Sequence, residues 1–441
     1  MILLRSFLNV FNIPELSKKI FVTLGILFLF RIGTHIPVIG VDINALHLQM
    51  QQLRGLGGAF MYIDTLSAGA LSKCTLFALG IGPYISSSII MQMLSMTVPS
   101  LEALMKEGEY GRKIINQYTR YLALGISIFH SASLAMLLET KGLVLEAGWS
   151  FRFLFILSLV TGSMLTMWLG EQISLHGIGN GSSMLIFANI VSRFPTDILV
   201  LAGEVMQGNL DIIYPVLILA LFVFVAACIV FLERGERKIP VQYARRIVGQ
   251  KMYGGQSSYI PFKLNTAGIM PVIFTSVIIN IPRLVSTMFA ERFFVFKWLS
   301  NALAPMGLVD TVLNFALIMM FSFVYTAMIF SPEEVAENIK KSGGYIPGIR
   351  PGRKTAEYFT AVLNRLGLVG SVYLAALALL PTILYFVIGH SSLIRVSFLS
   401  GTSLLIMVGV ALELAAKIES YLIEHRYEGL LSSGRFKARG Y

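Results

Sequence analysis

Ten stretches of mostly apolar residues, each close to the length of a membrane-spanning helix, dominate this 441-residue sequence. A helix needs about 20 such residues to cross the hydrocarbon core of a bilayer. The runs lie at residues 20–38, 74–98, 121–138, 153–170, 182–202, 212–232, 267–289, 308–331, 366–389 and 396–412. The sequence therefore predicts an all-α integral membrane protein with ten transmembrane helices.

The composition agrees with a membrane as the solvent for much of the chain. Charged residues make up only 13% of the sequence, about half their share in soluble globular proteins, and the mean hydropathy is +0.73. So few charges cannot cover a surface in water, which excludes soluble enzymes, nucleic-acid-binding domains and disordered scaffolds. The first run follows Lys18 and Lys19 without a small-residue cleavage site, so we expect it to stay in the membrane rather than to be removed as a signal peptide.

The positions of the basic residues predict the orientation of the chain. Of the 35 Lys and Arg residues, 25 lie in segments on the same side of the membrane as the N-terminus, and 8 lie in or beside the connections on the other side. Because basic segments are retained in the cytoplasm, we expect both termini there. The net charge of +11 favours anionic lipids as partners rather than nucleic acid.

Two internal matches predict a duplicated unit of five spans. The segment Leu79–Ile90 shares six of twelve positions with Ala267–Ile278, and Gly181–Ile186 shares four of six with Gly401–Ile406. Both matches have the same order and the same displacement of five spans. Because five is odd, the second copy must enter the membrane inverted. We therefore expect an N-terminal half at 1–202, a C-terminal half at 203–412 and a cytoplasmic tail at 413–441.

Inverted repeats place the functional axis between the halves, near the middle of the membrane, and helices interrupted by Gly or Pro mark it. Pro83 and Pro271 are such a matched pair, although they could instead simply kink helices for packing. Residues four apart share one helical face. The matched pairs of this kind are Ile81 with Ile85, Ile269 with Ile273, Ser182 with Ile186, and Thr402 with Ile406. A collar of branched apolar side chains excludes ions by dewetting; core packing or lipid exposure is the alternative for any single isoleucine.

No pattern in the sequence indicates a catalytic, cofactor or metal site. Cys74 and Cys228 form neither a disulfide framework nor a metal cluster, and are interpreted as packing residues. Zinc-protease, nucleotide-binding and serine-hydrolase motifs are absent from the sequence. A secondary carrier with five-plus-five inverted repeats is weakened because the spans carry no acidic residue between their interfacial ends. An intramembrane enzyme or an assembly scaffold is a third alternative.

Several multi-residue motifs resemble the SecY family, the channel subunits of the bacterial protein translocase. They are Phe30–Gly40, Gly69–Lys73, Phe77–Ile85, Asn116–Arg120, Trp168–Gln172, Gly177–Gly181, Lys340–Gly343 and Pro347–Gly352. The resemblance runs from about residue 15 to the C-terminal tail. It implies a passive channel, not an enzyme, that moves unfolded secretory proteins across a membrane and releases membrane proteins sideways into it.

The resemblance implies an hourglass pore narrowed by a ring of aliphatic side chains. The matching positions are Ile81, Ile85, Ser182, Ile186, Ile273 and Ile406. Ser182 departs from the aliphatic pattern of the family, and a hydroxyl at the constriction should make wetting easier.

The resemblance also implies a plug and a lateral gate. The outer segment 57–71 matches the plug, with an interfacial helix as the alternative; its residues include Gly57, Phe60, Ile63, Asp64, Leu66 and Leu71. The gate would lie between spans two and three on one side and seven and eight on the other. Gln92 and Asn280 occupy equivalent places in the repeat and could bond across the closed gate; ordinary interhelical bonding is an equally good interpretation.

Two cytoplasmic segments, 233–266 and 332–365, are more basic than topology requires. The resemblance implies that they dock the ribosome and the motor ATPase SecA. The candidate docking residues are Arg237, Lys238, Arg245, Arg246, Arg350, Arg353 and Lys354. Pro-Gly turns bracket Arg350, which matches a position important for the motor. The connection 171–181 lacks a charged pair that many members carry, which puts a charge-based contact there in doubt.

The family further implies the partners and the location. The partners are the membrane subunits SecE and SecG, SecA, the ribosome, signal sequences and nascent polypeptides, anionic lipids, and also SecDF and YidC. The location is the bacterial inner membrane, with the thylakoid membrane as the alternative.

Overall fold

The computed structural model describes residues 13–42, 45–46, 70, 73–140, 142–208, 211–243, 246–248, 251–253, 257–289, 293–304, 307–388 and 401–432. The chain divides into two compact units. The first contains Met1–Ala202, Arg283–Ser300 and Val410–Tyr441, and the second contains Gly203–Pro282 and Asn301–Gly409. The sequence halves 1–202 and 203–412 and the tail 413–441 describe the expected duplication and stay a prediction.

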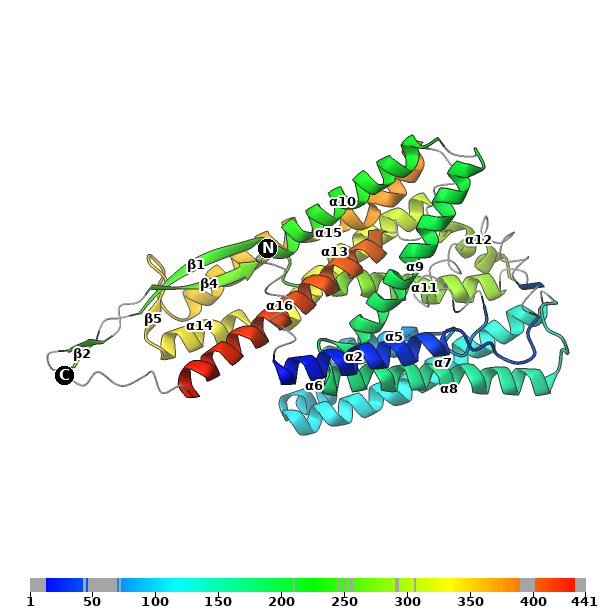
Figure 1. Ribbon diagram of the computed structural model, residues 1–441. Helices are drawn as coiled ribbons and strands as arrows, with labels where there is room; N and C mark the ends of the chain where they lie inside the picture. Colours follow the sequence, from blue (N-terminus) through cyan, green and yellow to red (C-terminus); the bar gives the residue numbers. More distant parts are fainter. Residues whose placement is uncertain are drawn as a thin grey trace. The chain divides into compact units, whose positions relative to one another are not determined.

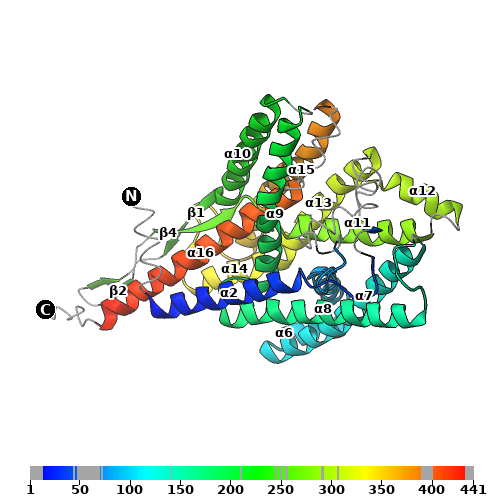
Figure 2. The same ribbon diagram turned by 45° about the vertical axis from the view of Figure 1, so that its right-hand side comes forward.

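The first unit is built mainly from long helices, with one short helix at a bend. They are α2 (Pro14–Gly33), α5 (Gly82–Thr97), α6 (Pro99–Lys106), α7 (Glu109–Thr140), α8 (Trp149–His176) and most of α9 (Gly181–Met206). Helix α7 packs against α5 and α8, and α8 also packs against α2. The three helices α2, α7 and α8 therefore lie alongside one another, as both views show (Figures 1 and 2).

The second unit combines helices with a small sheet. Its helices are α10 (Ile213–Arg234), α13 (Leu308–Ile329), α14 (Pro332–Lys341) and α15 (Arg353–Ile388). Its strands are β1 (Glu236–Tyr243), β2 (Arg246–Val248), β3 (Lys251–Tyr253), β4 (Ser257–Lys263) and β5 (Gly344–Tyr345). Three further helices contribute to both units: α11 (Met270–Phe289), α12 (Phe294–Ala302) and α16 (Gly401–Ser432).

Each of the ten predicted apolar runs overlaps one of these helices, so the mainly helical membrane architecture is confirmed. Six helices of the described chain are long and apolar enough to span a bilayer. A seventh is obtained when α5 and α6, which meet at a 99° bend, are taken as one span. Helix α11 contributes a shorter apolar stretch, Met270–Asn280. The prediction did not include the strands, which lie in the two basic segments.

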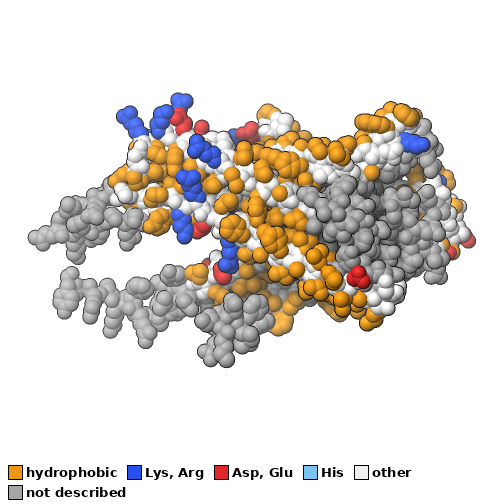
Figure 3. Space-filling model, turned by 90° about the horizontal axis from the view of Figure 1, so that it is seen from above, with side chains coloured by type: hydrophobic (Ala, Val, Ile, Leu, Met, Phe, Trp, Pro, Cys, Tyr) orange, Lys and Arg blue, Asp and Glu red, His pale blue; other side chains and the backbone are white. Residues whose placement is uncertain are grey.

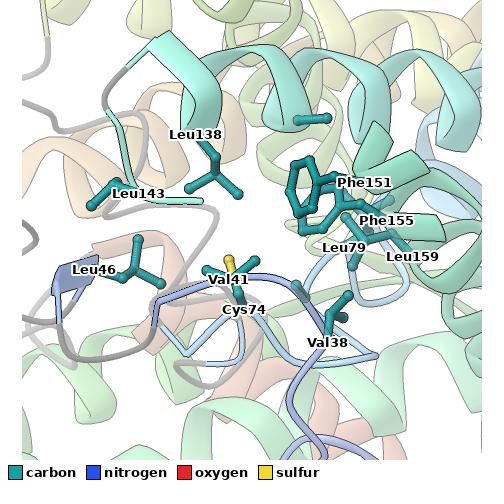
Figure 4. Packing of buried hydrophobic residues seen from close by; sticks show 12 residues of the cluster. Val38, Val41, Leu46, Cys74, Leu79, Leu138, Leu143, Phe151, Phe155 and Leu159 are labelled. Carbon is teal, nitrogen blue, oxygen red and sulfur yellow. The ribbon is translucent and has the colours of Figure 1, made fainter. Parts of the chain in front are cut away.

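A dry cluster holds the first unit together where α7 and α8 are joined. It combines residues of the segments before α5 with the end of α7 and the start of α8 (Figure 4). The members are Val38, Val41, Leu46, Cys74, Ala78, Leu79, Ala135, Leu138, Leu143, Phe151, Phe155 and Leu159. Cys74 is 2% exposed within this cluster, as expected for a packing residue. The equivalent core of the second unit joins α10, α11, α13, α15 and α16.

The surface exposes many large apolar side chains, as is typical of a membrane protein. On the face shown in Figure 3, hydrophobic side chains form a broad continuous area, and Lys and Arg side chains gather toward one side of it. Large apolar side chains on the long helices are exposed, among them Phe28 at 68% and Phe231 at 74%. Exposed apolar area on this scale is unusual for a protein that is surrounded by water on all sides.

Candidate functional site

The two proline-containing segments of the repeat have the same backbone plan. Helix α5 begins at Gly82, directly before Pro83, and α11 begins at Met270, directly before Pro271. Proline is favoured in the first helical turn, where its missing N–H has no helical partner to lose. The prolines therefore lie in the first turns of helices rather than at kinks within them. Residues 74–81, which the predicted span 74–98 included, form turns and an isolated bridge at Thr75 instead of helix.

A left-handed glycine precedes each of these helices at the same place. Gly80 has φ +54° and Gly268 has φ +61°, a region that other residues enter only with strain. The next residue is a buried isoleucine in both copies, Ile81 at 4% and Ile269 at 8% exposure. Its carbonyl accepts the first helical bonds, from Ile85 at 3.1 Å in one copy and from Ile273 at 3.3 Å in the other. The repeat seen in the sequence is thus a repeat of turn geometry.

Each turn packs directly against a helix at a glycine, with a carbonyl of the turn where a side chain would otherwise be. This contact is here called the seat of the turn. The Leu76 carbonyl oxygen lies so close to Gly162 of α8 that a Cβ at 162 would overlap it. In the second unit, the Leu264 carbonyl oxygen lies in the same way against Gly370 of α15. Leu76 and Leu264 are equivalent in the repeat, and each glycine is followed by a buried serine. The sequence comparison missed this glycine pair because only two consecutive residues match.

The third matched segment is also a helix start. Helix α9 begins at Gly181, where a Cβ would overlap the Gly170 carbonyl of α8. A Cβ added at Gly170 would lie 3.2 Å from Ile81 Cδ1 and 3.4 Å from Leu185 Cδ1. The beginnings of α5 and α9 therefore meet at this position of α8. In the second unit Ile269 packs against Gly409 of α16.

The predicted ring residues lie at or near these helix starts. In the first unit Ile81 and Ile186 are buried, at 4% and 3% exposure, whereas Ile85 and Ser182 are half-buried. In the second unit Ile273 is 7% and Ile406 is 2% exposed. The assignment of these six side chains to one ring stays a prediction.

The hydroxyl and the N–H of Ser182 both take part in a capping interaction at the start of α9. Its hydroxyl donates to Asn180 Oδ1 at 2.7 Å, and its backbone N–H donates to the same oxygen at 3.1 Å. Asn180 thus caps α9. Ser174 lies in the 171–181 connection, which lacks the charged pair that many family members carry. Its hydroxyl accepts a hydrogen bond from the Gly181 N–H at 2.8 Å and so helps to fix the start of α9.

Charge contacts beside that connection were not predicted. Arg120 of α7 donates two hydrogen bonds to the Glu171 carboxylate of α8, at 2.9 and 2.8 Å. At the opposite ends of the same two helices, Arg152 pairs with Glu139. Two ion pairs therefore fasten α7 to α8. Sequence alone gives no signal for them, because the partners are 51 and 13 residues apart.

The predicted plug residues Gly57, Phe60, Ile63, Asp64, Leu66 and Leu71 lie outside the described residues. The residues that flank the segment are described. Leu46 and Cys74 belong to the same dry cluster, and Thr75 donates a backbone bond at 3.0 Å to Ala70, which is 1% exposed. The chain on either side of residues 47–69 is therefore anchored in one core.

The two predicted gate residues are half-buried on equivalent helices. Gln92 of α5 lies 3.4 Å from the Ser88 hydroxyl one turn earlier in its own helix. Asn280 lies on α11 at the position that the repeat matches to Gln92. A bond between the two stays a prediction.

The two basic segments do not form separate loops. Strand β1 pairs antiparallel with β4 along seven residue pairs, and β5 from the second basic segment pairs with the end of β1. Strands β1, β4 and β5, helix α14 and the first turns of α15 form one packed body, here called the sheet body. Its core contains Ile239, Val241, Phe262, Ala336, Ile339, Ile346, Ala356, Phe359, Val362 and Leu363.

Arg350 projects from a rigid loop of the sheet body. Ile346–Ile349 form a turn closed by a 3.0 Å backbone bond, with Gly348 at φ +81°. The Thr355 hydroxyl donates to the Arg350 carbonyl at 3.1 Å. The Arg350 side chain is exposed, and no described residue forms an ion pair with it.

The neighbouring cations are arranged differently. Arg353 and Lys354 both lie against Glu357, at 3.4 and 2.8 Å. The Lys354 hydrogen bond lowers the pKa of the Glu357 carboxyl from its usual value. On the hairpin, Arg237 and Lys238 are exposed, and Lys238 pairs with Glu236 at 3.2 Å. Arg245 lies outside the described residues, as does the side chain of Arg246 in β2. Within the described part of the chain, no group of three His, Cys, Asp or Glu side chains could hold a metal ion.

Comparison with known proteins gives one consistent family. The SecY family matches residues 75–415. A protein translocase subunit SecY from Streptomyces scabiei is 41% identical over 97% of this chain and 100% of the relative. The Thermus thermophilus subunit is 40% identical over 99% of this chain and 100% of its own length. The Escherichia coli K12 subunit is 40% identical over 97% of each.

Solved channel structures have the same fold. A protein conducting channel superimposes with a TM-score of 0.65 at 18% identity, covering 93% of this chain and 96% of that chain. Sec61 from a canine ribosome-channel complex superimposes with a TM-score of 0.60 at 16% identity over the same shares. At these identities the likeness shows the fold alone, and the ten predicted spans are consistent with that fold.

Proposed function

Because this chain belongs to the SecY family, we propose that its six ring residues, its plug segment and its sheet body perform the steps of polypeptide passage. The chain is a multi-pass membrane protein and a protein-conducting channel subunit. The observation that carries this conclusion is the match of 40–41% over nearly the whole chain to translocase subunits. That match favours a translocation channel over the secondary carrier considered from the repeat.

We infer the following sequence of events. A signal sequence enters between spans two and three on one side and seven and eight on the other, where Gln92 and Asn280 lie on α5 and α11. The plug segment 57–71 then moves away. The unfolded chain passes the ring of Ile81, Ile85, Ser182, Ile186, Ile273 and Ile406, whose branched side chains resist the entry of hydrated ions. No bond is made or broken by the channel, and its partners supply the energy.

The sheet body is the proposed docking surface for SecA and the ribosome. A Sec61 channel and a yeast Ssh1 channel of similar fold are known in complexes with ribosomes, which supports the ribosome as a partner. The docking residues would be Arg237, Lys238, Arg245, Arg246, Arg350, Arg353 and Lys354. SecE, SecG, SecDF, YidC and anionic lipids complete the proposed set of partners.

We place the channel in the bacterial inner membrane with both termini in the cytoplasm. The bacterial source of its relatives favours this membrane over the thylakoid. The excess of basic residues in the segments that contain the sheet body supports the orientation.

Reconstitution tests the proposed function directly. The chain is incorporated into lipid vesicles with SecE and SecG, and a preprotein with a signal sequence is added with SecA and ATP. We expect the preprotein to become protected from external protease, and protection to be lost when detergent opens the vesicles. Vesicles without this chain, and a preprotein without its signal sequence, are the controls. An absence of protection in the complete system would contradict the proposal.

Ser182 offers a test of the ring. The Ser182→Ile substitution removes a hydroxyl from the constriction, so we expect the ion leak of the idle channel to fall about fivefold, the effect of roughly 1 kcal/mol for one hydrogen-bonding group. The backbone bond to Asn180 remains available to start α9. The measurement is conductance in planar bilayers. Thr161→Ile, at an exposed position of α8, is the matched control, and an unchanged leak in Ser182→Ile would argue against the ring.

A further inference from the structure

The turn that leads into α11 is fastened at several points within the second unit. The Leu264 N–H donates to the Gly235 carbonyl at 2.8 Å. The Asn265 side-chain amide donates to Glu233 Oε1 at 2.7 Å and to the Gly268 carbonyl at 2.9 Å. The Leu264 carbonyl is seated on Gly370. Asn265 is 4% exposed, so its amide needs these acceptors.

The equivalent turn in the first unit uses the same backbone contacts with a different side-chain pair. The Leu76 N–H donates to the Ile36 carbonyl at 2.8 Å, and the Leu76 carbonyl is seated on Gly162. The following residue, Phe77, stacks on Phe30 in the last turn of α2, with ring centroids 5.4 Å apart. A Phe–Phe stack therefore occupies the place of the Asn265–Glu233 pair. The second unit has a directional, charge-assisted contact where the first has a non-directional apolar one.

The polar pair lies at the base of the β1–β4 hairpin. Glu233 is in the last turn of α10, three residues before β1 begins, and Asn265 follows the end of β4 by two residues. The terminal pair of the hairpin, Glu236 with Lys263, is directly beyond it. The pair thus joins the two ends of the hairpin where they enter the apolar helices.

The other side of the same turn leads into the predicted ring. Gly268 accepts the second Asn265 hydrogen bond, and Ile269, the next residue, packs against Gly409 of α16. The first helical bond of Ile273 goes back to the Ile269 carbonyl at 3.3 Å. These contacts connect Asn265, over four residues, to Ile269 and to the start of α11.

From this geometry we propose that Glu233 and Asn265 are positioning residues that make the β1–β4 hairpin and the first turn of α11 move together. A partner that binds the hairpin and displaces it would then also shift Ile269 and Ile273, instead of only bending the hairpin. The inference rests on the proposed function for its biological use, but the mechanical connection is independent of that function. Neither residue needs to touch the translocating chain.

The Asn265 amide and the Glu233 carboxyl each provide a hydrogen-bond partner for the other. Removing the Glu233 carboxyl leaves the buried Asn265 amide short of an acceptor, and removing Asn265 leaves the half-buried Glu233 carboxyl without its donor, whereas replacing both with apolar groups avoids these penalties. Single substitutions should therefore loosen the turn. A double Glu233→Leu/Asn265→Leu variant should fold well while lacking the directional bond.

The first measurement is amide hydrogen exchange in the first turn of α11, in the detergent-solubilised full chain. Residues 270–273 are followed at every position except Pro271, which has no N–H; the Val272 and Ile273 N–H groups bond the Ile269 carbonyl at 3.2 and 3.3 Å. We expect Glu233→Leu and Asn265→Leu each to speed exchange about tenfold, since 1.4 kcal/mol corresponds to a factor of ten. Glu233→Gln, which keeps an acceptor oxygen, should have a smaller effect. Thr266→Ala, whose hydroxyl bonds the Lys263 carbonyl at 3.2 Å at an exposed site, is the matched control. Unchanged exchange in both leucine variants would overturn the inference.

The second measurement is the change in that exchange when SecA docks. In the wild type, docking should alter exchange at residues 270–273. In the double leucine variant this response should fall about fivefold or more, as a coupling of 1 kcal/mol requires, while the SecA dissociation constant stays the same. A retained response, or a weakened SecA affinity, would overturn the coupling. If SecA fails to bind the wild-type channel, the proposed motor docking is wrong, and the first measurement still decides whether the pair positions α11.

Discussion

Replacing Arg350 with glutamate is expected to reduce SecA-driven export by at least about tenfold, because interfacial charge pairs couple by roughly 1.5 kcal/mol or more. The side chain is exposed on a loop whose shape is set by two left-handed glycines, Gly348 and Gly352. Arg353 and Lys354 share Glu357, whereas no described residue forms an ion pair with Arg350. Arg350 therefore has no ion pair with a described residue to give up on binding an acidic group of the motor, whereas Arg353 and Lys354 would have to share or release Glu357.

The measurement is protease-protected preprotein per unit time in vesicles with SecA and ATP. Lys341→Glu is the matched control, because it reverses a charge at an exposed site on α14 of the same sheet body. Thermal unfolding of both variants should match the wild type, since neither substitution touches the core of the sheet body. Normal export by Arg350→Glu, or an equal defect in Lys341→Glu, would show that the loop does not act through Arg350.

Placing an alanine at Gly162 or Gly370 is expected to destabilise the protein by about 3 kcal/mol, at the upper end of the usual effect of overpacking. Each new Cβ would overlap the backbone carbonyl of a turn, Leu76 in one unit and Leu264 in the other. A backbone atom cannot move aside as a flexible side chain can. The turn must therefore leave its seat, and the following helix start must move with it.

Two neighbouring glycines provide controls with the opposite expected sign. Gly367 lies on α15 three residues before Gly370, where the nearest atom to a new Cβ is Phe323 Cε1 at 3.7 Å, and Gly125 of α7 has open space. Alanine at either site should be neutral or stabilise the helix by up to about 1 kcal/mol. Thermal unfolding in detergent, followed by circular dichroism, separates the two groups. Equal behaviour of all four variants would contradict the seating of the turns.

The helical part of the architecture was predictable because it depends on local hydropathy. Every apolar run overlaps a helix, and the repeat matches fall at the starts of α5, α9, α11 and α16. The predicted spans are wrong at their ends. Residues 74–81 are apolar enough to be assigned to a span, but Gly80 in the left-handed region interrupts the helix before Pro83. Hydropathy averages over a window and cannot detect one backbone angle.

The candidate site was predictable in parts. Ile81, Ile186, Ile273 and Ile406 were named from the repeat, and all four are buried near helix starts. The polar Glu233–Asn265 pair was not predicted, because each residue by itself looks like an ordinary polar residue at the end of a span. Its role is visible only when the 2.7 Å contact is seen together with the Phe30–Phe77 stack in the equivalent place.

Hydropathy and repeat pattern are properties of neighbouring residues, so they were enough to place the apolar helices, the matched helix starts and the motifs of the family. The sheet body, by contrast, could not be predicted from neighbouring residues. It unites strands β1 and β4 with β5, which lies about a hundred residues further along the chain, through a core that no local pattern specifies. The same holds for the turns seated on Gly162 and Gly370. These features arise where distant segments meet, because close packing and buried hydrogen bonds are satisfied only by the folded chain.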